Sequence, residues 1–163
     1  MPNTQLTRQI GEHLVVAELG RHGIVATPFS GNMPDYDIVA LTQTGYSIYI
    51  QVKAINNGDW QLSANHFLVV EYDESSNTQK IDALRPTPVA PLLFVLVRIV
   101  ESGKDEFYVL SYSEVQQIVR KYYSRTIGKS RHFALREDFV KSYKVEALTE
   151  EQIERSITRA KKR

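Results

Sequence analysis

Three polar residues stand at the ends of two short apolar runs. Asp37 precedes residues 38–40, and Gln51 and Lys53 close the run that begins at Ile48. Because side chains of a strand alternate between its faces, Gln51 and Lys53 are expected on one face, with the residue between them facing the core. An acid, an amide and an amine that converge on one sheet edge suit a divalent cation and a phosphate: hard cations take oxygen ligands, and an ammonium stabilises charge developing on a phosphoryl group.

The elements that must position these residues can be predicted from the first third of the chain. Helical periodicity over residues 4–22 predicts a helix that stops at a glycine, followed by a short strand over 24–28 and a loop over 29–33. The β-branched runs 36–41 and 46–52 predict a hairpin. The predicted apolar stripe of the helix consists of Leu6, Ile10, Leu14, Ala17 and Leu19.

The middle of the chain is harder to interpret. Residues 60–63 are compatible with a strand and 67–72 with either a helix or a strand, whereas 85–91 holds three of the six prolines and predicts a connecting loop. The apolar run 92–100 is typical of a central buried strand, and 107–110 is expected to pair with it.

Two more helices are predicted from capping signals. Ser113 followed by Gln116 has the form of a capping box and predicts a helix that begins there and ends near residue 123. A last helix is predicted over about residues 149–161, with Thr149 as its cap.

Composition excludes several classes of protein. The 163 residues are 42% hydrophobic and 24% charged, which predicts a single domain over residues 1–163 with one sizeable core. Zero cysteines exclude disulfide frameworks, thiolate zinc sites and cysteine nucleophiles. No segment resembles a signal peptide or a membrane span, so we expect a cytoplasmic protein with no membrane association.

The net charge of +1 hides an uneven distribution. Residues 115–136 carry six basic residues and no acid, interleaved with aromatic rings. Because basic side chains neutralise phosphates and rings stack on bases, the stretch is a candidate nucleic-acid track. A solvated helix face plus a loop explains the same pattern. The basic residues taken as candidate contacts are Arg120, Lys121, Arg125, Lys129 and Arg131.

Each candidate site residue has a simpler alternative. Asp37 can terminate a turn, and neighbouring Asp35 can cap the loop or act as an alternate ligand. Glu12 can be a solvent-facing helix charge, and Glu18 lies about 120° away from it around the helix. Lys53 can be an ordinary lysine at the end of a strand.

Taken together, Asp37 and the element Gln51–Val52–Lys53 resemble the PD-(D/E)XK nuclease superfamily, in a form in which glutamine replaces the second acid. The resemblance runs from about residue 4 to 53, with weaker support to about 120. It implies that Glu12 is a fourth site residue. The loop that carries Ser30 and Asn32 resembles the Ser-Gly loop of Holliday-junction resolvases and Mrr-like endonucleases, which implies nucleic-acid contacts by these two residues.

The resemblance implies an α/β fold with a restriction-endonuclease-like mixed central sheet flanked by helices, in the order α-β-β-β, an intervening segment, then β-β-α. It also implies Mg²⁺ or Mn²⁺ bound by Asp37, Gln51 and Glu12, a DNA substrate and a homodimer. The implied activity is metal-dependent hydrolysis of DNA phosphodiester bonds, with Lys53 orienting the water or stabilising the charge.

Because a neutral carbonyl attracts a cation less strongly than a carboxylate, Gln51 keeps two alternatives open. One is an inactive nucleic-acid-binding module with a nuclease fold. The other is a protein-interaction domain of a defence or mobile-element system.

Overall fold

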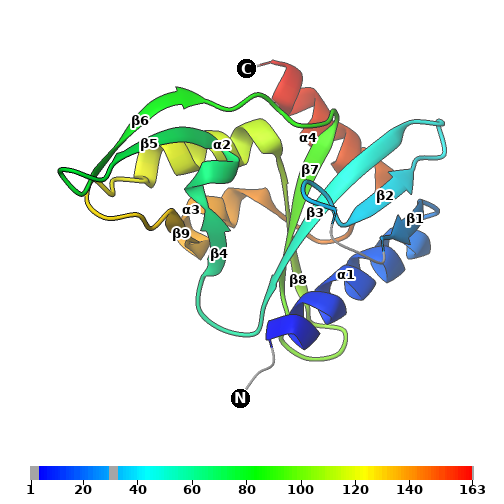
Figure 1. Cartoon of the computed structure of the whole chain (residues 1–163). Coiled ribbons are helices and arrows are strands. Elements are labelled where there is room, and N and C mark those ends of the chain that lie inside the picture. The colour runs from blue at the N-terminus through cyan, green and yellow to red at the C-terminus, as the bar shows by residue number, and fades with distance from the viewer. Residues whose placement is uncertain (1–3, 30–32, 163) are drawn as a thin grey trace.

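The computed structural model describes residues 4–29 and 33–162 (Figure 1). None of the helices in these ranges is long and apolar enough to cross a membrane. The elements follow one another as α1 (Thr4–Arg21), β1 (Val25–Pro28), β2 (Ile38–Leu41), β3 (Ser47–Ile55), β4 (Trp60–Ser63), the 3₁₀ turn η1 (Ala64–His66), β5 (Leu68–Asp73), β6 (Thr78–Leu84), β7 (Leu92–Arg98), β8 (Glu106–Ser111), α2 (Tyr112–Tyr122), β9 (His132–Leu135), α3 (Glu137–Val140), η2 (Lys141–Tyr143), β10 (Lys144–Val145) and α4 (Glu150–Lys161).

A six-stranded sheet in the order β1-β2-β3-β7-β8-β10 forms the centre of the fold. Strands β3 and β7 are parallel, whereas the other neighbours in this sheet are antiparallel. The predicted fold class, a mixed central sheet flanked by helices, is therefore confirmed. The order α1-β1-β2-β3 at the start and β7-β8-α2 after the intervening segment is also as predicted.

The two faces of the sheet bury separate apolar clusters. One cluster joins α1 and α4 to the face that carries Ile50, Val52 and Val95. The other joins α2 and the small sheets to the face that carries Phe94 and Leu96. Every residue of β7 except the last is buried, because helices or small sheets cover both faces of this strand.

Helix α1 packs on a face that is rotated from its predicted apolar stripe, of which Leu19 is buried and Leu14 is half-buried against the same cluster. Its buried residues are Thr7, Gly11, Val15 and Leu19, whereas Leu6 and Ile10 are 52% and 39% exposed. The reason is close packing at Gly11, where an added Cβ would lie 2.3 Å from the Cβ of Ala54 in β3. The small residue lets the helix backbone approach the sheet, and this contact selects the buried face.

The predicted cap of α2 is also wrong, because the helix begins one residue after Ser111. The hydroxyl of Ser111 accepts a hydrogen bond from the backbone N–H of Glu114, and the Glu114 carboxylate accepts one from the backbone N–H of Ser111. This is a capping box shifted by two residues from the predicted one at Ser113 and Gln116. The predicted cap of α4 is confirmed, since the hydroxyl of Thr149 accepts from the backbone N–H of Gln152.

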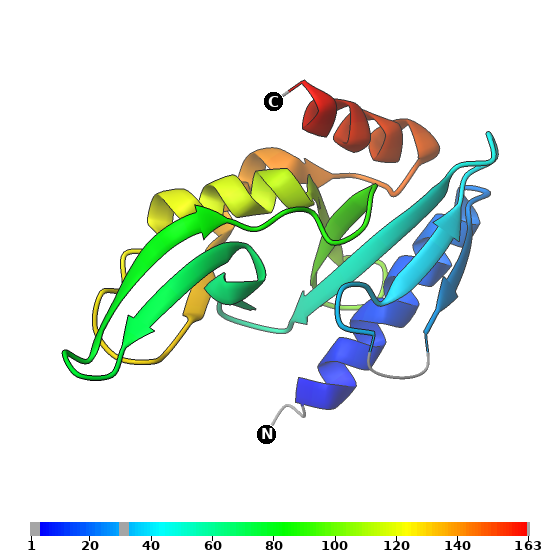
Figure 2. The same ribbon diagram turned by 45° about the horizontal axis from the view of Figure 1, so that its top comes forward.

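The segment between β3 and β7 contains three strands, of which one was predicted. Strand β4 is confirmed at residues 60–63, but it pairs with β9, which the sequence did not indicate. Strands β5 and β6 form a separate antiparallel hairpin. In both views the hairpin lies at the end of the molecule away from β1 and β2 (Figures 1 and 2).

Candidate active site

The carboxylate of Asp37 is held in place by several hydrogen bonds. Asp37 precedes β2, is 4% exposed, and its backbone N–H donates to the carbonyl of Ile50 at 2.8 Å. Its Oδ2 accepts from the backbone N–H of Val52 at 2.8 Å and from the side-chain amide of Gln51, and its Oδ1 accepts from Nη2 of Arg8 at 3.0 Å. The β2–β3 ladder therefore holds the carboxylate at the edge of the sheet in one orientation.

The side chain of Gln51 is oriented by this carboxylate. An ionised carboxylate only accepts hydrogen bonds, so the amide nitrogen of Gln51 must face Asp37. The carbonyl oxygen then points away from Asp37 and is free for another donor or a cation. For Gln51 and Asp37 to share one cation, the amide must turn over.

Lys53 lies two residues after Gln51 in β3. The two side chains are therefore on the same face of the strand, as strand alternation predicts. Both residues line a cleft of about 410 Å³ beside the sheet, whereas Val52 is 2% exposed and packs in the cluster under α1. Burial lowers the pKa of Lys53, and the nearby charge of Asp37 partly offsets this effect. The ammonium is thus a partly desolvated donor in the wall of a cleft.

Arg8 connects Glu12 to Asp37 by ion pairs with both carboxylates. It was not among the predicted site residues. Nε of Arg8 donates to Oε1 of Glu12 at 2.9 Å while Nη2 donates to Asp37. Gly11 brings this part of α1 against β3, which places the two side chains beside the site. The spacing of four residues between Arg8 and Glu12 is the signal that could have indicated the pair. The competing acid Glu18 instead pairs with Arg21 and His22.

The donor atoms fit a magnesium-like cation by their chemistry. The carboxylates of Asp37 and Glu12 and the carbonyl of Gln51 are hard oxygen ligands. In residues 4–29 and 33–162, no three His, Cys, Asp or Glu side chains gather as a metal site, so any further ligand would be the Gln51 carbonyl, a backbone carbonyl, water or the substrate. The guanidinium of Arg8 donates to both carboxylates. Cation binding at these oxygens therefore requires Arg8 to withdraw.

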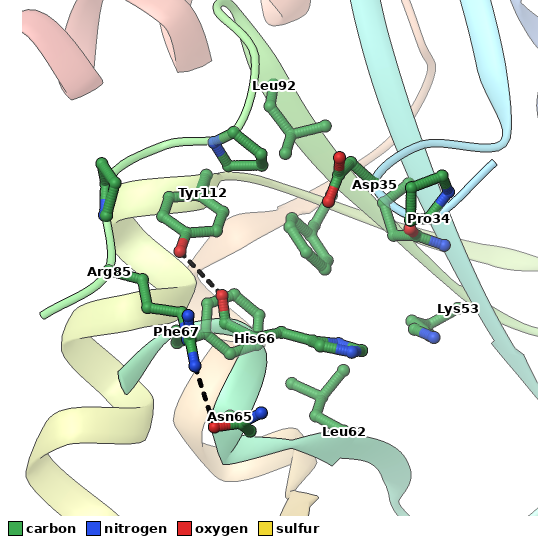
Figure 3. Close-up of a pocket in the computed structure, with 14 residues that line it drawn as sticks. Pro34, Asp35, Lys53, Leu62, Asn65, His66, Phe67, Arg85, Leu92 and Tyr112 are labelled. Atoms are coloured by element: carbon green, nitrogen blue, oxygen red, sulfur yellow. Dashed lines mark hydrogen bonds between the residues drawn. The ribbon is translucent and has the colours of Figure 1, made fainter. Parts of the chain in front are cut away.

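The far side of the cleft is built by elements distant in the sequence. Figure 3 shows Lys53, Pro34 and Asp35 on one side and His66, Asn65, Arg85 and Tyr112 on the other. The last four come from the end of β4 through η1, the loop after β6 and the start of α2. None of these four was among the predicted site residues, since no local pattern connects them.

The basic residues predicted to contact nucleic acid fall into two groups, one exposed near the end of α2 and one in contact with the β5–β6 hairpin. Arg120, Lys121 and Arg125 are exposed at the end of α2 and just beyond it. Lys129 pairs with Glu74 at 2.9 Å, and Arg131 donates to Gln79 at 3.1 Å, so these two cations contact the β5–β6 hairpin. Ser30 and Asn32 lie outside the residues that the structure describes.

Comparisons with known proteins give one informative likeness. No protein-family model and no curated protein matches the chain. Among solved structures the chain is similar to the bacterial homing endonuclease I-Ssp6803I, with a TM-score of 0.51 and 15% sequence identity over 99% of this chain and 97% of that chain. At this identity the likeness concerns the fold: the mixed sheet and its flanking helices form an α/β fold that an endonuclease also has.

Proposed function

We propose that the protein is a DNA endonuclease of the PD-(D/E)XK type that hydrolyses phosphodiester bonds with Mg²⁺ or Mn²⁺. The observation that carries the proposal is the pair of hydrogen-bonded residues Asp37 and Gln51, with Lys53 on the same wall of an open cleft. The similarity in fold to a homing endonuclease supports it independently of these residues.

The residues have distinct roles in this proposal. Asp37, Glu12 and the carbonyl of Gln51 would hold the cation, which supplies a more acidic water and charge neutralisation at the phosphate when it is bound. Lys53 donates a hydrogen bond to the attacking water or to a non-bridging phosphate oxygen. Its partial burial strengthens this interaction, because fewer waters compete for the ammonium.

The direct test is incubation of the purified protein with supercoiled plasmid and with branched DNA, in Mg²⁺, Mn²⁺ or EDTA. Nicked or linear products that require a metal and disappear in Lys53→Met support the proposal. Intact DNA under every metal condition, with protein that is folded by circular dichroism, contradicts it.

Two observations favour a second candidate, a nucleic-acid-binding module without turnover. Gln51 brings no charge to the cation site, and Arg8 already offsets one of the two negative charges of Asp37 and Glu12. Such a module would bind DNA with an affinity that falls steeply with salt, because phosphate contacts release counterions. Binding that is equal in EDTA and in Mg²⁺, without any cleavage, identifies this candidate.

Binding of DNA as a homodimer belongs to the same proposal. It rests on the resemblance to the superfamily, in which two catalytic domains often cut two strands. Sedimentation velocity with and without duplex DNA tests it.

The exposed cations Arg120, Lys121 and Arg125 are the proposed phosphate contacts outside the cleft, and charge removal there should reduce the salt dependence of binding.

A further inference from the structure

The wall of the cleft opposite Lys53 carries its own cationic groups. Arg85 and His66 lie on this wall. The cleft is also lined by apolar side chains that include Leu62, Leu92 and Phe94. The cleft volume of about 410 Å³ lies within the range of small-molecule and cofactor pockets.

Arg85 is held rigidly in this wall without an acidic partner. Its Nε donates to the carbonyl of Leu68 at 3.2 Å, and its Nη2 donates to the side-chain oxygen of Asn65 at 3.1 Å. No carboxylate of the described residues forms an ion pair with it. A guanidinium has more N–H groups than these two bonds use, so the remaining donors can bind a ligand. A fixed guanidinium without an ion-pair partner among the described residues is suited to the planar recognition of a phosphate, and the nearest acid of the cleft, Asp35, lies on its other side.

The backbone around Arg85 is fixed as well. Its N–H donates to the carbonyl of Phe67 at 2.9 Å, and its carbonyl accepts from Nε2 of Gln116 at 2.7 Å. The hydroxyl of Tyr112 donates to the carbonyl of His66 at 2.8 Å. Arg85 and His66 are therefore presented by one preorganised wall, which reduces the entropy lost on binding a ligand.

The imidazole of His66 lies among both cationic and acidic groups of the cleft. Burial lowers the pKa of His66, and the charges of Lys53 and Arg85 lower it further, while Asp35 acts in the opposite direction. His66 is thus mostly neutral at pH 7 and can donate or accept a hydrogen bond. An anion bound between Lys53 and Arg85 would gain from both charges.

We propose that Arg85, assisted by His66, binds a second phosphate of the nucleic-acid strand that is cut beside Lys53. The strand then crosses the cleft, with one phosphate at the Asp37–Lys53 wall and another at Arg85. The apolar residues that line the cleft contact the sugar or base of the intervening nucleotide. This inference rests on the proposed nuclease function for the identity of the strand, while the phosphate site itself is defined by Arg85.

The experiment titrates 5′-phosphorylated dithymidylate, which carries two phosphates, into the protein in EDTA so that cleavage does not occur. Nuclear magnetic resonance follows the imidazole of His66, and calorimetry gives the dissociation constant. We expect the dinucleotide to shift the His66 signals and raise the pKa of His66. Inorganic phosphate and thymidine 5′-monophosphate, each with one phosphate, should bind at least about tenfold more weakly.

The matched pair of variants is Arg85→Gln and Lys80→Gln. Each removes one positive charge from the segment between β3 and β7, but Lys80 is exposed on β6, pairs with Glu71 and does not line the cleft. Arg85→Gln should weaken dinucleotide binding about tenfold, a loss typical of a charge-assisted phosphate contact, and Lys80→Gln should leave it unchanged. Because Arg85 also supports η1, melting curves accompany each titration. Arg85→Lys keeps the positive charge but lacks the planar set of guanidinium donors, so it should bind the dinucleotide with intermediate affinity.

Equal effects of the two glutamine variants, or a dinucleotide titration of the wild type that leaves the His66 signals unmoved, would overturn the inference. Tighter binding of inorganic phosphate than of the dinucleotide would also overturn it, since the site would then select a free anion. If plasmid is cut equally well by wild type and Arg85→Gln, the nuclease proposal stands and this inference fails. If the dinucleotide binds through Arg85 but no DNA is ever cut, the site stands and catalysis fails.

Discussion

The two walls of the cleft are held in place by different kinds of bond. The wall that carries Gln51 and Lys53 is part of the central sheet, and the buried carboxylate of Asp37 behind it accepts hydrogen bonds from residues 14 and 15 positions away. The opposite wall is held by side chains of α2 that bond to backbone groups, and Gln116 donates to the carbonyl of Phe67 across 49 positions. The first wall is therefore determined by strand alternation, whereas the second depends on distant contacts.

This difference leads to different expectations for mutation. Replacing a side chain in the sheet wall should alter chemistry or charge while the ladder keeps its geometry. Replacing a support of the opposite wall should move backbone and change how a ligand fits. Variants of the two walls distinguish these expectations.

Lys53→Met should reduce the rate of DNA cleavage by about a thousandfold, near 4 kcal/mol in barrier, because it removes the donor that stabilises phosphate charge. Stability should be unchanged or slightly higher, since burial already disfavours the ammonium. Single-turnover kinetics and urea denaturation measure both quantities. The control is Lys104→Met, in the turn before β8, where the ammonium pairs with the nearby Glu101; a similar rate loss there would remove the case for Lys53.

Asp37→Asn should destabilise the fold by about 1–3 kcal/mol as well as stop cleavage. The new amide places N–H groups against donors from Arg8, Gln51 and Val52, so buried hydrogen bonds are lost. The matched control is Asp35→Asn, an exposed neighbour that should stay within about 0.5 kcal/mol of wild type. Equal stabilities of the two variants would mean that the side-chain hydrogen bonds of Asp37 do not stabilise the fold.

Gln51→Glu should destabilise the metal-free protein by about 1–2 kcal/mol at pH 7 and increase its stabilisation by Mg²⁺. Two carboxylates then face each other without the amide donor, which raises the pKa of one above its unfolded value. The destabilisation is therefore present above that raised pKa and disappears as the pH falls below about 4, where both states bind the proton. Thermal melts across pH, with EDTA or Mg²⁺, measure this. A variant that magnesium does not stabilise more than wild type would show that residue 51 is not a ligand.

Ser111→Ala should cost about 1 kcal/mol, whereas Ser113→Ala should cost less than about 0.5 kcal/mol. Only Ser111 bonds to the backbone N–H of Glu114, and this cap begins the helix that supports the opposite wall. Urea denaturation of both variants gives the comparison. The reverse ranking would support the cap predicted from sequence.

Arg8→Ala should tighten Mg²⁺ binding by a few-fold, about 0.5–1 kcal/mol, because the guanidinium competes with a cation for Asp37 and Glu12. Calorimetry in the absence of DNA measures the affinity directly. Arg21→Ala, at the other end of α1 beside Glu18, is the control and should leave it unchanged. Weaker binding in Arg8→Ala would mean that Arg8 organises the ligands instead of competing with the metal.

The parts of the structure that depend on local patterns could be predicted from the sequence, whereas the parts that depend on distant contacts could not. Apolar runs and turn signals predicted the start of the sheet, the central strand β7 and the convergence of Gln51 and Lys53 on one face, since these depend on local alternation. The buried face of α1 was not predictable from its apolar stripe, because the contact between Gly11 and Ala54 decides it. Gln116 was predicted to belong to a capping box, yet it is only 8% exposed and its side-chain amide donates to two carbonyls distant in the sequence. Such bonds leave no local pattern in the sequence.

The parallel pairing of β3 with β7 has a consequence for engineering. The intervening segment leaves the sheet after Ile55 and returns at Leu92, which pairs with Tyr49, so β3 and β7 fix its two ends six residues of strand apart, roughly 20 Å. Extra residues in the tip between β5 and β6 would add only the slowly growing entropy of closing a longer loop. The tip at residues 74–77 can therefore take insertions while β3 and β7 keep their pairing.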